Sequence, residues 1–378
     1  MKRLVLLGGG HAHLAVLKDL AERPLDGWQV LLVTPFRRQI YSGMLPGWVG
    51  GEYAIDDCAI ALDALAERAG IALRITSCTG LDLSKNTVAC ADGSTVHFDL
   101  LSIDTGPVPA LDNLQGALAN ALPIRPIEGF VAAWPGHVDR IAGQCDRFEM
   151  VVLGAGAAGV ELVLAMHRKA STDGWSHLRI TLIGSDALPL EGVAESARRH
   201  VAELLAQRSI RWIGGRRATQ IAPNRIDFAQ GASVDFDACI TVTGAAAPSW
   251  PSASGLATDA SGFIRVGRTL QTPLHPHILA AGDVAAYQDP RPKSGVFAVR
   301  AGPVLAHNLR ALCRGDMPKP WSPQQRALYL ISTGDRRAIA AWGRWAWRGA
   351  WVWRWKDRID RQFVARFAAH HSLESQPQ

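Results

Sequence analysis

The stretch MVVLGAGAAGVE, residues 150–161, decides the fold class of this chain. An apolar run leads into a GxGxxG pattern, and a helical pattern follows, which predicts a strand, a tight turn and a helix. Gly154 makes the turn, Gly156 lets a phosphate approach the backbone, and Gly159 lets the helix pack on the strand. The stretch therefore predicts a dinucleotide-binding unit.

The chain opens on a second copy of this layout, LVLLGGGHAHLAVL at residues 4–17. The helix that follows these glycines points its N-terminal N–H groups at a pyrophosphate, so its first residues are predicted contacts. His13 stands where the third glycine would be. Either the helix packs less closely on the strand there, or the imidazole faces the bound nucleotide.

A longer repeat supports this pairing. VACADGSTVHFDLLSIDTG at residues 88–106 and IDFAQGASVDFDACITVTG at residues 226–244 share a glycine, a valine, a Phe-Asp pair and a terminal Thr-Gly at one constant offset. Duplication of a nucleotide-binding unit explains the match. The expected fold class is α/β, with two tandem Rossmann-like domains and a short C-terminal segment.

Proline-rich stretches mark where the chain crosses between the two domains. Prolines at 107, 109, 123 and 126 lie at one crossing, and prolines at 248 and 251 lie at the return. The expected division is residues 1–112 with 255–325 for the first domain, 120–250 for the second, and 326–378 for a Trp/Arg-rich C-terminal segment.

The composition excludes several classes of protein. With 48% apolar and 20% charged residues the chain is globular. Its cysteines form no CxxC pair, and no two histidines share a helix face with an acid, so we expect no metal site. Scattered single cysteines are typical of a cytoplasmic protein. No apolar run is long enough to span a membrane.

The positive charge belongs to one segment. The net charge is +6, and residues 336–370 hold nine basic and two acidic residues, so the rest of the chain is close to neutral. No nucleic-acid-binding module is recognisable, and we expect no nucleic-acid partner.

That segment is rich in tryptophan and has a helical period. Trp351, Trp355, Ile359, Phe363 and Phe367 recur every four residues and are expected on one face, with basic residues largely on the others. Such a helix can lie in a membrane interface. It fits equally a helix packed on the protein's own core or on a second subunit, so peripheral membrane contact on the inner face and homodimerisation both stay open.

These motifs resemble the FAD/NAD(P)-dependent pyridine nucleotide-disulphide oxidoreductases, the class that includes type II NADH dehydrogenases and sulfide:quinone reductases. ILAAGD at residues 278–283 is similar to the second flavin motif of this class. GGGHAH at 8–13, YSGMLPG at 41–47, PKSGVFAVRAGPV at 292–304 and WKDRIDR at 355–361 are similar to the flavoprotein module found fused to selenide, water dikinase. We expect this chain to carry that module alone, without the kinase domain.

The resemblance implies FAD in the first domain and NADH or NADPH in the second. Hydride would pass from the nicotinamide to the flavin and on to a small-molecule acceptor, a quinone or a selenium or sulfur compound, or to a protein. The residues assigned to cofactor binding are Gly8, Gly10, His11, Ala12, His13, Thr34, Pro35, Ser42, Gly43, Met44, Thr105, Gly106, Gly154, Gly156, Gly159, Gly244, Gly282, Asp283, Gly295 and Val296.

Three residues are candidates for catalysis. Glu161 follows the second glycine turn, where it could steer the nicotinamide or relay a proton, or simply be a solvated acid favoured by the helix dipole. Lys293 could stabilise a reduced anionic flavin at its N1–O2 edge. Arg300 could do the same, contact an acceptor, or be an ordinary surface arginine.

The sequence departs from the class in ways that matter for function. An acid usually ends the second strand of each unit to bind a ribose. Here Thr34-Pro35 and Gly184-Ser185 stand in its place, so the nucleotide preference is open. An alternative is a flavin-containing binding or regulatory partner whose second nucleotide site is vestigial. A sulfide:quinone reductase would require a cysteine pair near the flavin, and residues 293–302 contain none.

Overall fold

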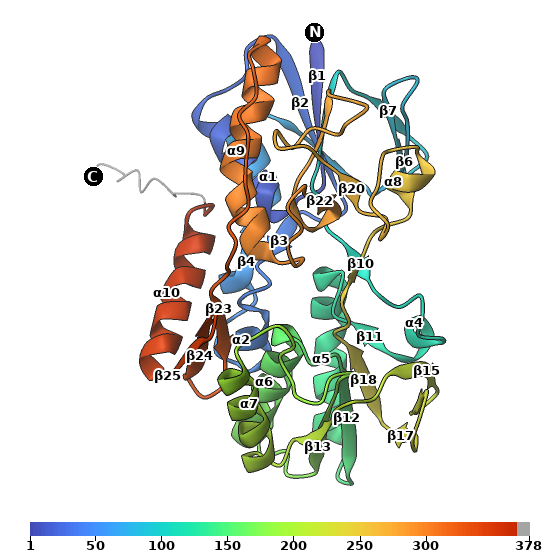
Figure 1. Ribbon diagram of the computed structural model, residues 1–378, viewed down its shortest axis with the longest axis vertical. Helices are drawn as coiled ribbons and strands as arrows, with labels where there is room; N and C mark the ends of the chain where they lie inside the picture. Colours follow the sequence, from blue (N-terminus) through green and yellow to red (C-terminus); the bar gives the residue numbers. More distant parts are fainter. Residues whose placement is uncertain (369–378) are drawn as a thin grey trace, which may run out of the picture.

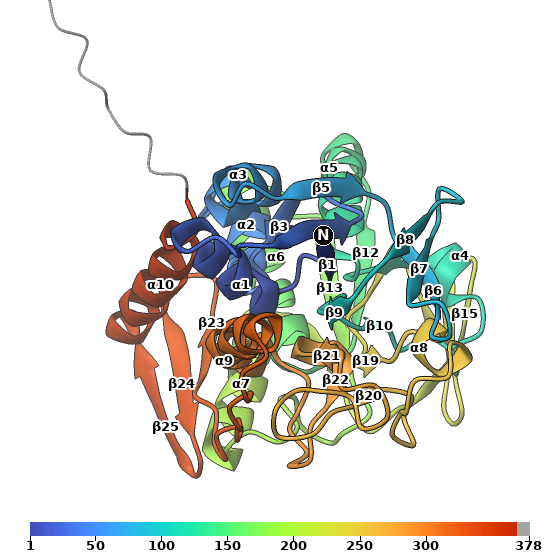
Figure 2. The same ribbon diagram turned by 90° about the horizontal axis from the view of Figure 1, so that it is seen from above.

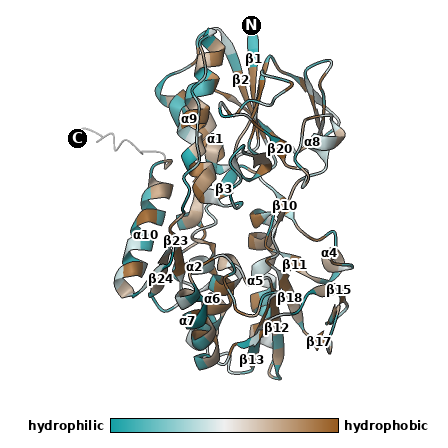
Figure 3. Cartoon of the chain, viewed as in Figure 1, coloured by the Kyte–Doolittle hydropathy of each residue, from teal (hydrophilic) through white to brown (hydrophobic). Residues whose placement is uncertain are grey.

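The computed structural model describes residues 1–368. Two five-stranded parallel sheets, each flanked by helices, lie one above the other, and a small C-terminal unit packs beside them (Figure 1). Strands β12 and β18 are brown in Figure 3, whereas the outer helix α7 is largely teal, as expected for sheets buried between helices. The α/β prediction is confirmed.

The first sheet has the strand order β21-β9-β1-β2-β5. Its strands are β1 (Lys2–Leu7), β2 (Trp28–Thr34), β5 (Ala72–Ile75), β9 (Leu100–Ile103) and β21 (Ile278–Ala280). Its helices are α1 (His11–Glu22), α3 (Leu62–Arg68) and α9 (Gly295–Arg314). α1 and α9 pack closely because Gly302 has no side chain to keep it from Ala12 and Ala15.

The second sheet repeats this plan with the order β11-β18-β12-β13-β14. Its strands are β11 (Leu122–Pro123), β12 (Phe148–Leu153), β13 (Leu178–Ile183), β14 (Arg211–Ile213) and β18 (Ala238–Thr241). Its helices are α5 (Ile127–Gly143), α6 (Ala157–Asp173) and α7 (Glu195–Gln207). In both sheets a glycine turn joins the central strand to the next helix.

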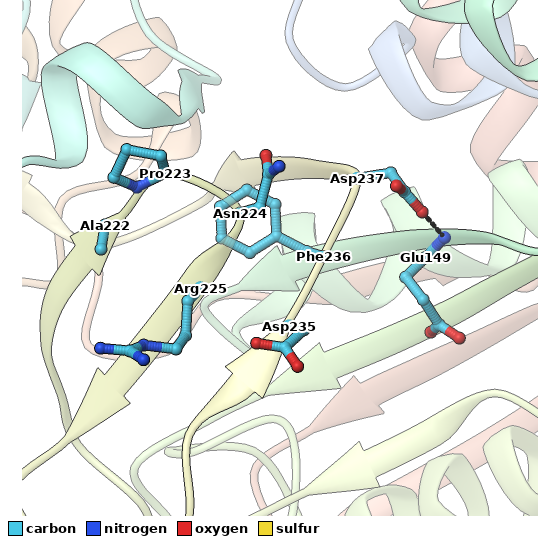
Figure 4. A pocket seen from close by; sticks show the side chains of 8 residues that line it. All are labelled: Glu149, Ala222, Pro223, Asn224, Arg225, Asp235, Phe236 and Asp237. Atoms are coloured by element: carbon cyan, nitrogen blue, oxygen red, sulfur yellow. Dashed lines mark hydrogen bonds between the residues drawn. The ribbon is translucent and has the colours of Figure 1, made fainter.

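A three-stranded antiparallel meander accompanies each sheet, and the two meanders explain the repeated Phe-Asp pair. They are β6 (Cys78–Asp82), β7 (Thr87–Cys90) and β8 (Thr95–His97), and β15 (Ala218–Ala222), β16 (Arg225–Phe228) and β17 (Val234–Asp235). Asp99 accepts a hydrogen bond from the backbone N–H of Arg3 at 2.6 Å, and Asp237 from that of Glu149 at 2.7 Å. The hollow around Asp237 in Figure 4 surrounds this tie. The pair therefore fastens each meander to the start of a central strand.

Short elements complete the two halves. The chain passes between them along β10 (Val108–Pro109) and β19 (Ala245–Ala246), which pair antiparallel. The others are α2 (Leu45–Val49), α4 (Ala117–Asn120), α8 (Trp250–Ala253), β3 (Arg38–Ile40), β4 (Ala59–Ala61), β20 (Ile264–Arg265), β22 (Ala285–Ala286), η1 (Asp56–Cys58) and η2 (Gly282–Val284). The β10–β19 pair lies close to the predicted crossings. We therefore propose residues 1–112 with 255–325 for the first domain, 120–250 for the second and 326–378 for the C-terminal segment.

The C-terminal unit is a small antiparallel sheet covered by one helix. β23 (Tyr329–Ser332), β24 (Ala338–Trp342) and β25 (Trp345–Gly349) precede α10 (Ala350–Ala365). Figure 2 shows α10 on the outer side of this sheet. One sheet face joins the core around α6 through Ile331 and Ile339, and the other packs on α10 through Val352. Residues 369–378 of the predicted segment, including His370 and His371, lie outside the described residues.

The structure corrects the predicted apolar face of α10. Phe363 and Phe367 are buried, but Trp351, Trp355 and Ile359 are 52%, 41% and 39% exposed. A spacing of four residues advances about 40° around a helix at each step. The series therefore winds from the outer face to the inner one. Within residues 1–368 no helix combines the length and apolar character needed to cross a membrane.

Candidate functional site

A cavity of about 410 Å³ opens at the first glycine turn, at the carboxyl ends of β1, β2 and β9. The ends of parallel strands are where α/β sheets bind ligands. Ten of the predicted cofactor-binding residues line this cavity: Gly8, Gly10, His11, Thr34, Pro35, Ser42, Thr105, Gly106, Asp283 and Gly295. Residues from the start, middle and later part of the chain thus converge there, as their motifs predicted.

His13 lies outside the lining and faces the core. Its side chain is fully buried, with Nδ1 2.6 Å from the carbonyl oxygen of Gly8 and Nε2 2.8 Å from Oγ of Ser102. Burial lowers the pKa of His13 to about 4, so the ring is neutral at physiological pH. The imidazole therefore fills the space of the missing third glycine and braces the turn. The alternative in which it faces the nucleotide has no geometric support.

Asp104 is a cavity residue that the sequence reasoning missed. It is 2% exposed, and its Oδ2 accepts hydrogen bonds from the backbone N–H groups of Ala12 and His13 at 2.8 and 2.9 Å. Burial raises its pKa to about 7, although both amides favour the charged form. The repeat contained a signal: Val242 stands at the equivalent position of the second half. Asp104 thus brings a carboxylate to the start of α1.

Two basic residues missed by the motifs also line the cavity. Arg125 lies 3.7 Å from the Asp283 carboxylate. Burial raises the pKa of Asp283, and the Arg125 charge opposes that rise. Arg38 bonds Glu128 of α5 at 3.0 and 3.2 Å. Both arginines therefore face the cavity as members of ion pairs, each with a carboxylate that also lines it.

The cavity has the features expected of a dinucleotide site. His11 Nε2 is buried and has no hydrogen-bond partner among residues 1–368, while its ring contacts Tyr41 and Phe363. A side chain at Gly106 or Gly295 would meet open space. An unpartnered buried nitrogen and free glycine surfaces together fit a ligand that brings its own polar groups.

The second glycine turn has the same backbone frame as the first but leaves the start of its helix open. A side chain at Gly154 would overlap the carbonyl of Val242, and one at Gly159 would overlap that of Gly154. Both glycines are therefore needed by the fold. Gly156 has an ordinary φ of −70° and open space around it. Gly244 also has open space around it. Since the fold itself does not require glycine at 156, open backbone at the start of α6 fits the approach of a phosphate.

Packing explains why the second unit has no ribose-binding acid at the end of its second strand, β13. A side chain at Gly184 would overlap the ring of Trp212, which leaves no room for a carboxylate. Asp186 lies two residues further on and is paired with Arg198 at 2.5 Å. The end of β13 is thus occupied by an indole ring.

Glu161 lies in a buried polar group. Its Oε1 accepts a hydrogen bond from the Ser332 N–H at 2.7 Å, and it is 9% exposed. Lys356 of α10 is also buried and donates to Asp360 at 2.6 Å and to the carbonyl oxygen of Gly43 at 2.7 Å. Burial raises the pKa of Glu161 to about 7, and the Lys356 charge opposes this. Glu161 is therefore no solvated helix-end acid.

The basic residues of α10, Lys356 among them, are predicted to lie largely off its apolar face, but the structure buries Lys356. Its immediate sequence neighbours are Trp355 and Asp357, so only the packing of α10 on the chain reveals its position. Through Gly43 it connects α10 to the predicted flavin wall, residues 42–44. Met44 is fully buried in this wall.

Lys293 and Arg300 lie outside the lining of the first cavity, and the catalytic roles given to them stay predictions. Lys293 donates to the carbonyl oxygen of Ala285 at 2.6 Å, and its Nζ lies 3.7 Å from the ring centre of Phe263. Arg300 and Val296 are exposed on α9. Neither basic residue lines the cavity. Among residues 1–368 no group of three His, Cys, Asp or Glu side chains could hold a metal ion.

Comparison with known proteins agrees with this architecture. The chain is 22% identical to the sulfide-quinone reductase of Aquifex aeolicus, over 91% of this chain and 87% of that protein. It is 29% identical to ferroptosis suppressor protein 1 of Xenopus laevis, over 89% and 87%. The structure of NDH2 from Plasmodium falciparum in complex with NADH superposes with a TM-score of 0.82 at 12% identity, covering 97% of each chain. The model of the pyridine nucleotide-disulphide oxidoreductases matches residues 2–302, and the chain belongs to this family of oxidoreductases.

Proposed function

We propose that this protein is an FAD-dependent NAD(P)H oxidoreductase that passes electrons to a quinone. The observation that carries the proposal is the pairing of two glycine turns at the ends of two equivalent sheets, one with a cavity and the other with open backbone at Gly156. A relative named sulfide-quinone reductase and a structural neighbour described with NADH support the acceptor and the donor.

The first cavity would hold FAD. Gly10 and His11 would meet the diphosphate with Arg125 opposite, and residues 42–44 would border the flavin. Bound FAD supplies the hydride-accepting centre, and the second turn would hold the nicotinamide nucleotide at Gly156. No acid can bind its ribose at Gly184 because Trp212 is in the way, so NADPH, whose 2′-phosphate an acid would repel, stays an acceptable donor.

The residues behind the flavin wall are suited to handling protons. Reduction of a quinone consumes protons, and a group titrating near neutral pH can both give and receive one. Burial raises the pKa of Glu161 to about 7, and Lys356, whose charge opposes that rise, donates a hydrogen bond to the Gly43 carbonyl oxygen of the wall. We therefore assign proton supply to Glu161, with the charges of Lys356 and Asp360 acting on its pKa.

A quinone is preferred over a sulfur compound because of where the cysteines lie. Cys78 is the only cysteine lining the cavity, and it is the first residue of strand β6 in the first meander. Burial raises the pKa of Cys78 to about 12, which keeps it as an unreactive thiol. No described cysteine pair stands next to the flavin wall.

The decisive experiment is anaerobic mixing of the yellow protein with NADH, and separately with NADPH, followed by addition of a short-chain quinone. We expect one nucleotide to bleach the oxidised flavin band and the quinone to restore it. A protein that holds FAD but is bleached by neither nucleotide would instead support a flavin-containing partner module. The ring of Trp212 from β14, which lies against Gly184 just after β13, is the observation that favours this second candidate.

We further propose peripheral contact with a membrane surface through a tryptophan face, defined as Trp342, Trp345, Trp347, Trp351, Trp355 and Ile359. All six are exposed, between 39% and 68%. The three strand tryptophans share the sheet face that carries α10, and exposed Arg344, Arg354 and Arg358 lie among them. Exposed indoles beside arginines favour a bilayer interface over internal packing.

This contact is tested by flotation with vesicles containing anionic lipid. We expect the intact protein to float with the vesicles and the Trp351→Ser, Trp355→Ser variant to stay behind with its flavin still bound. Leu118→Ser is the matched control, since Leu118 is 78% exposed on the second half of the molecule. Flotation that survives the double substitution, or a tight dimer that the substitution dissolves, would reject membrane contact through this face.

A further inference from the structure

A carboxylate of the protein itself, that of Asp104, lies at the start of α1. Oδ2 of Asp104 accepts hydrogen bonds from the backbone N–H groups of Ala12 and His13. Its Oδ1 lies against Gly10 and Gly282, and a side chain on either glycine would overlap it. Helix N-termini with free N–H groups are the usual sites for phosphate. Asp104 therefore stands between the two motifs that the family fold brings to the cofactor diphosphate.

A diphosphate and an ionised carboxylate at one helix end repel each other. The conflict disappears when Asp104 is protonated, because a neutral carboxylic acid can still accept the two N–H bonds at its carbonyl oxygen. Its hydroxyl can then donate a hydrogen bond toward a phosphate oxygen. The second unit has no such conflict, since Val242 occupies the equivalent position.

We propose that Asp104 makes dinucleotide binding at the first turn proton-linked: FAD binds with uptake of one proton by Asp104, and its affinity falls as the pH rises. This inference rests on the proposed function, since it takes FAD as the ligand of the cavity. The geometry assigns Asp104 as a binding residue: the site accepts a diphosphate when this carboxyl group is protonated.

The other charged groups facing Asp104 do not account for such a dependence. On α1, burial lowers the pKa of His11 and His13 to about 4, so both are neutral above pH 6 before FAD binds. Burial raises the pKa of Tyr287 far above that range. Lys293 lies beyond Asp283, on the carbonyl of Ala285. Asp283 remains, paired with Arg125, and needs its own control.

The experiment measures FAD dissociation from the holoprotein, by the rise in flavin fluorescence on dilution, between pH 6 and pH 9. We expect the dissociation constant to rise by up to about tenfold per pH unit in the upper part of this range, the limit for one linked proton. Asp104→Asn imitates the neutral acid and should bind FAD with little change across the range. Asp283→Asn should bind more weakly but keep the pH slope.

Proton uptake gives an independent readout. Rebinding FAD to the apoprotein in weakly buffered solution at pH 8, with an indicator dye, should consume close to one proton per site in the parent and none in Asp104→Asn. FAD that binds the parent with no proton uptake and no pH slope would overturn this inference and leave the proposed function standing. A parent that binds no FAD at any pH would overturn the proposed function itself.

Discussion

The two glycine turns follow the same backbone plan and differ in what lies beneath the helix. Gly8 donates to Val33 at 2.8 Å and Gly154 to Ile183 at 2.9 Å, and each presses on the carbonyl of the returning strand, at Asp104 and at Val242. In the first turn a carboxylate caps the helix; in the second an apolar side chain leaves the helix end free. A duplicated fold can thus keep its frame while its ligand chemistry diverges.

The third glycine position differs as well. Gly159 allows α6 to touch the Gly154 carbonyl, whereas His13 fills that space in the first turn and bonds Gly8 and Ser102. Two residues further along, α1 carries Ala15 against Gly302, and α6 carries the buried Glu161. The first helix is locked by packing, and the second takes part in a polar network.

The largest effect should come from removing the cation of that network. Lys356→Met leaves Glu161 and Asp360 buried without a positive charge, and we expect a loss of about 3 to 5 kcal/mol in the free energy of unfolding. Lys18→Met is the control, because Lys18 pairs with Glu22 on the exposed side of α1 and should change stability by less than about 0.5 kcal/mol. Urea unfolding of both variants checks this; equal losses would mean that the network is not important for stability.

Alanine at Gly10 and at Gly156, which are equivalent positions of the two turns, should have different effects on stability. Gly10→Ala would overlap the Asp104 carboxylate, so we expect a destabilisation of about 2 to 3 kcal/mol and loss of FAD. Gly156→Ala meets open space and should leave stability within about 0.5 kcal/mol while weakening nicotinamide nucleotide binding. Flavin content and nucleotide titration distinguish them, and a stable, yellow Gly10→Ala protein would contradict the contrast.

Restoring the family glycine in the first turn should harm it. His13→Gly removes a buried ring and leaves Ser102 and the Gly8 carbonyl without partners, at a cost of about 2 kcal/mol. Ser102→Ala, which removes only one partner, should cost about 1 kcal/mol. Thermal unfolding of the two variants measures the order; a more stable His13→Gly protein would show that the ring is not a brace.

The smallest effect at pH 6, and the most specific in its pH profile, concerns Glu161. Its pKa is raised from 4.5 to about 7, so the folded state binds a proton that the unfolded state releases, and this contribution to stability is lost as the pH rises through that range. Glu161→Gln should differ from the parent by less than about 1 kcal/mol at pH 6 and lose less stability between pH 6 and pH 8. Parallel pH profiles for the two proteins would rule out this titration.

Much of the site was readable from spacing. The first glycine pattern, the first Thr-Gly return and ILAAGD predicted residues that do meet at one cavity, because each motif marks the end of a parallel strand. Arg125, Arg38 and Lys356 carried no such mark. Arg125 reaches its place through the crossing between the halves, Arg38 through the short strand β3, and Lys356 through a helix that packs across the chain. The repeat pairs Asp104 with Val242, but only the hydrogen bonds of Asp104 to the start of α1 show what this difference does.

By itself, the sequence determined the class of fold, the duplication and the positions of both glycine turns, because these depend on local backbone geometry and on the periodicity of buried strands. Only the tertiary structure decided that Lys293 turns away from the cavity, that Trp212 takes the place of a ribose-binding acid, and that Lys356 lies inside and Trp355 outside. Those outcomes depend on which surfaces distant segments bury, and a linear pattern does not record that.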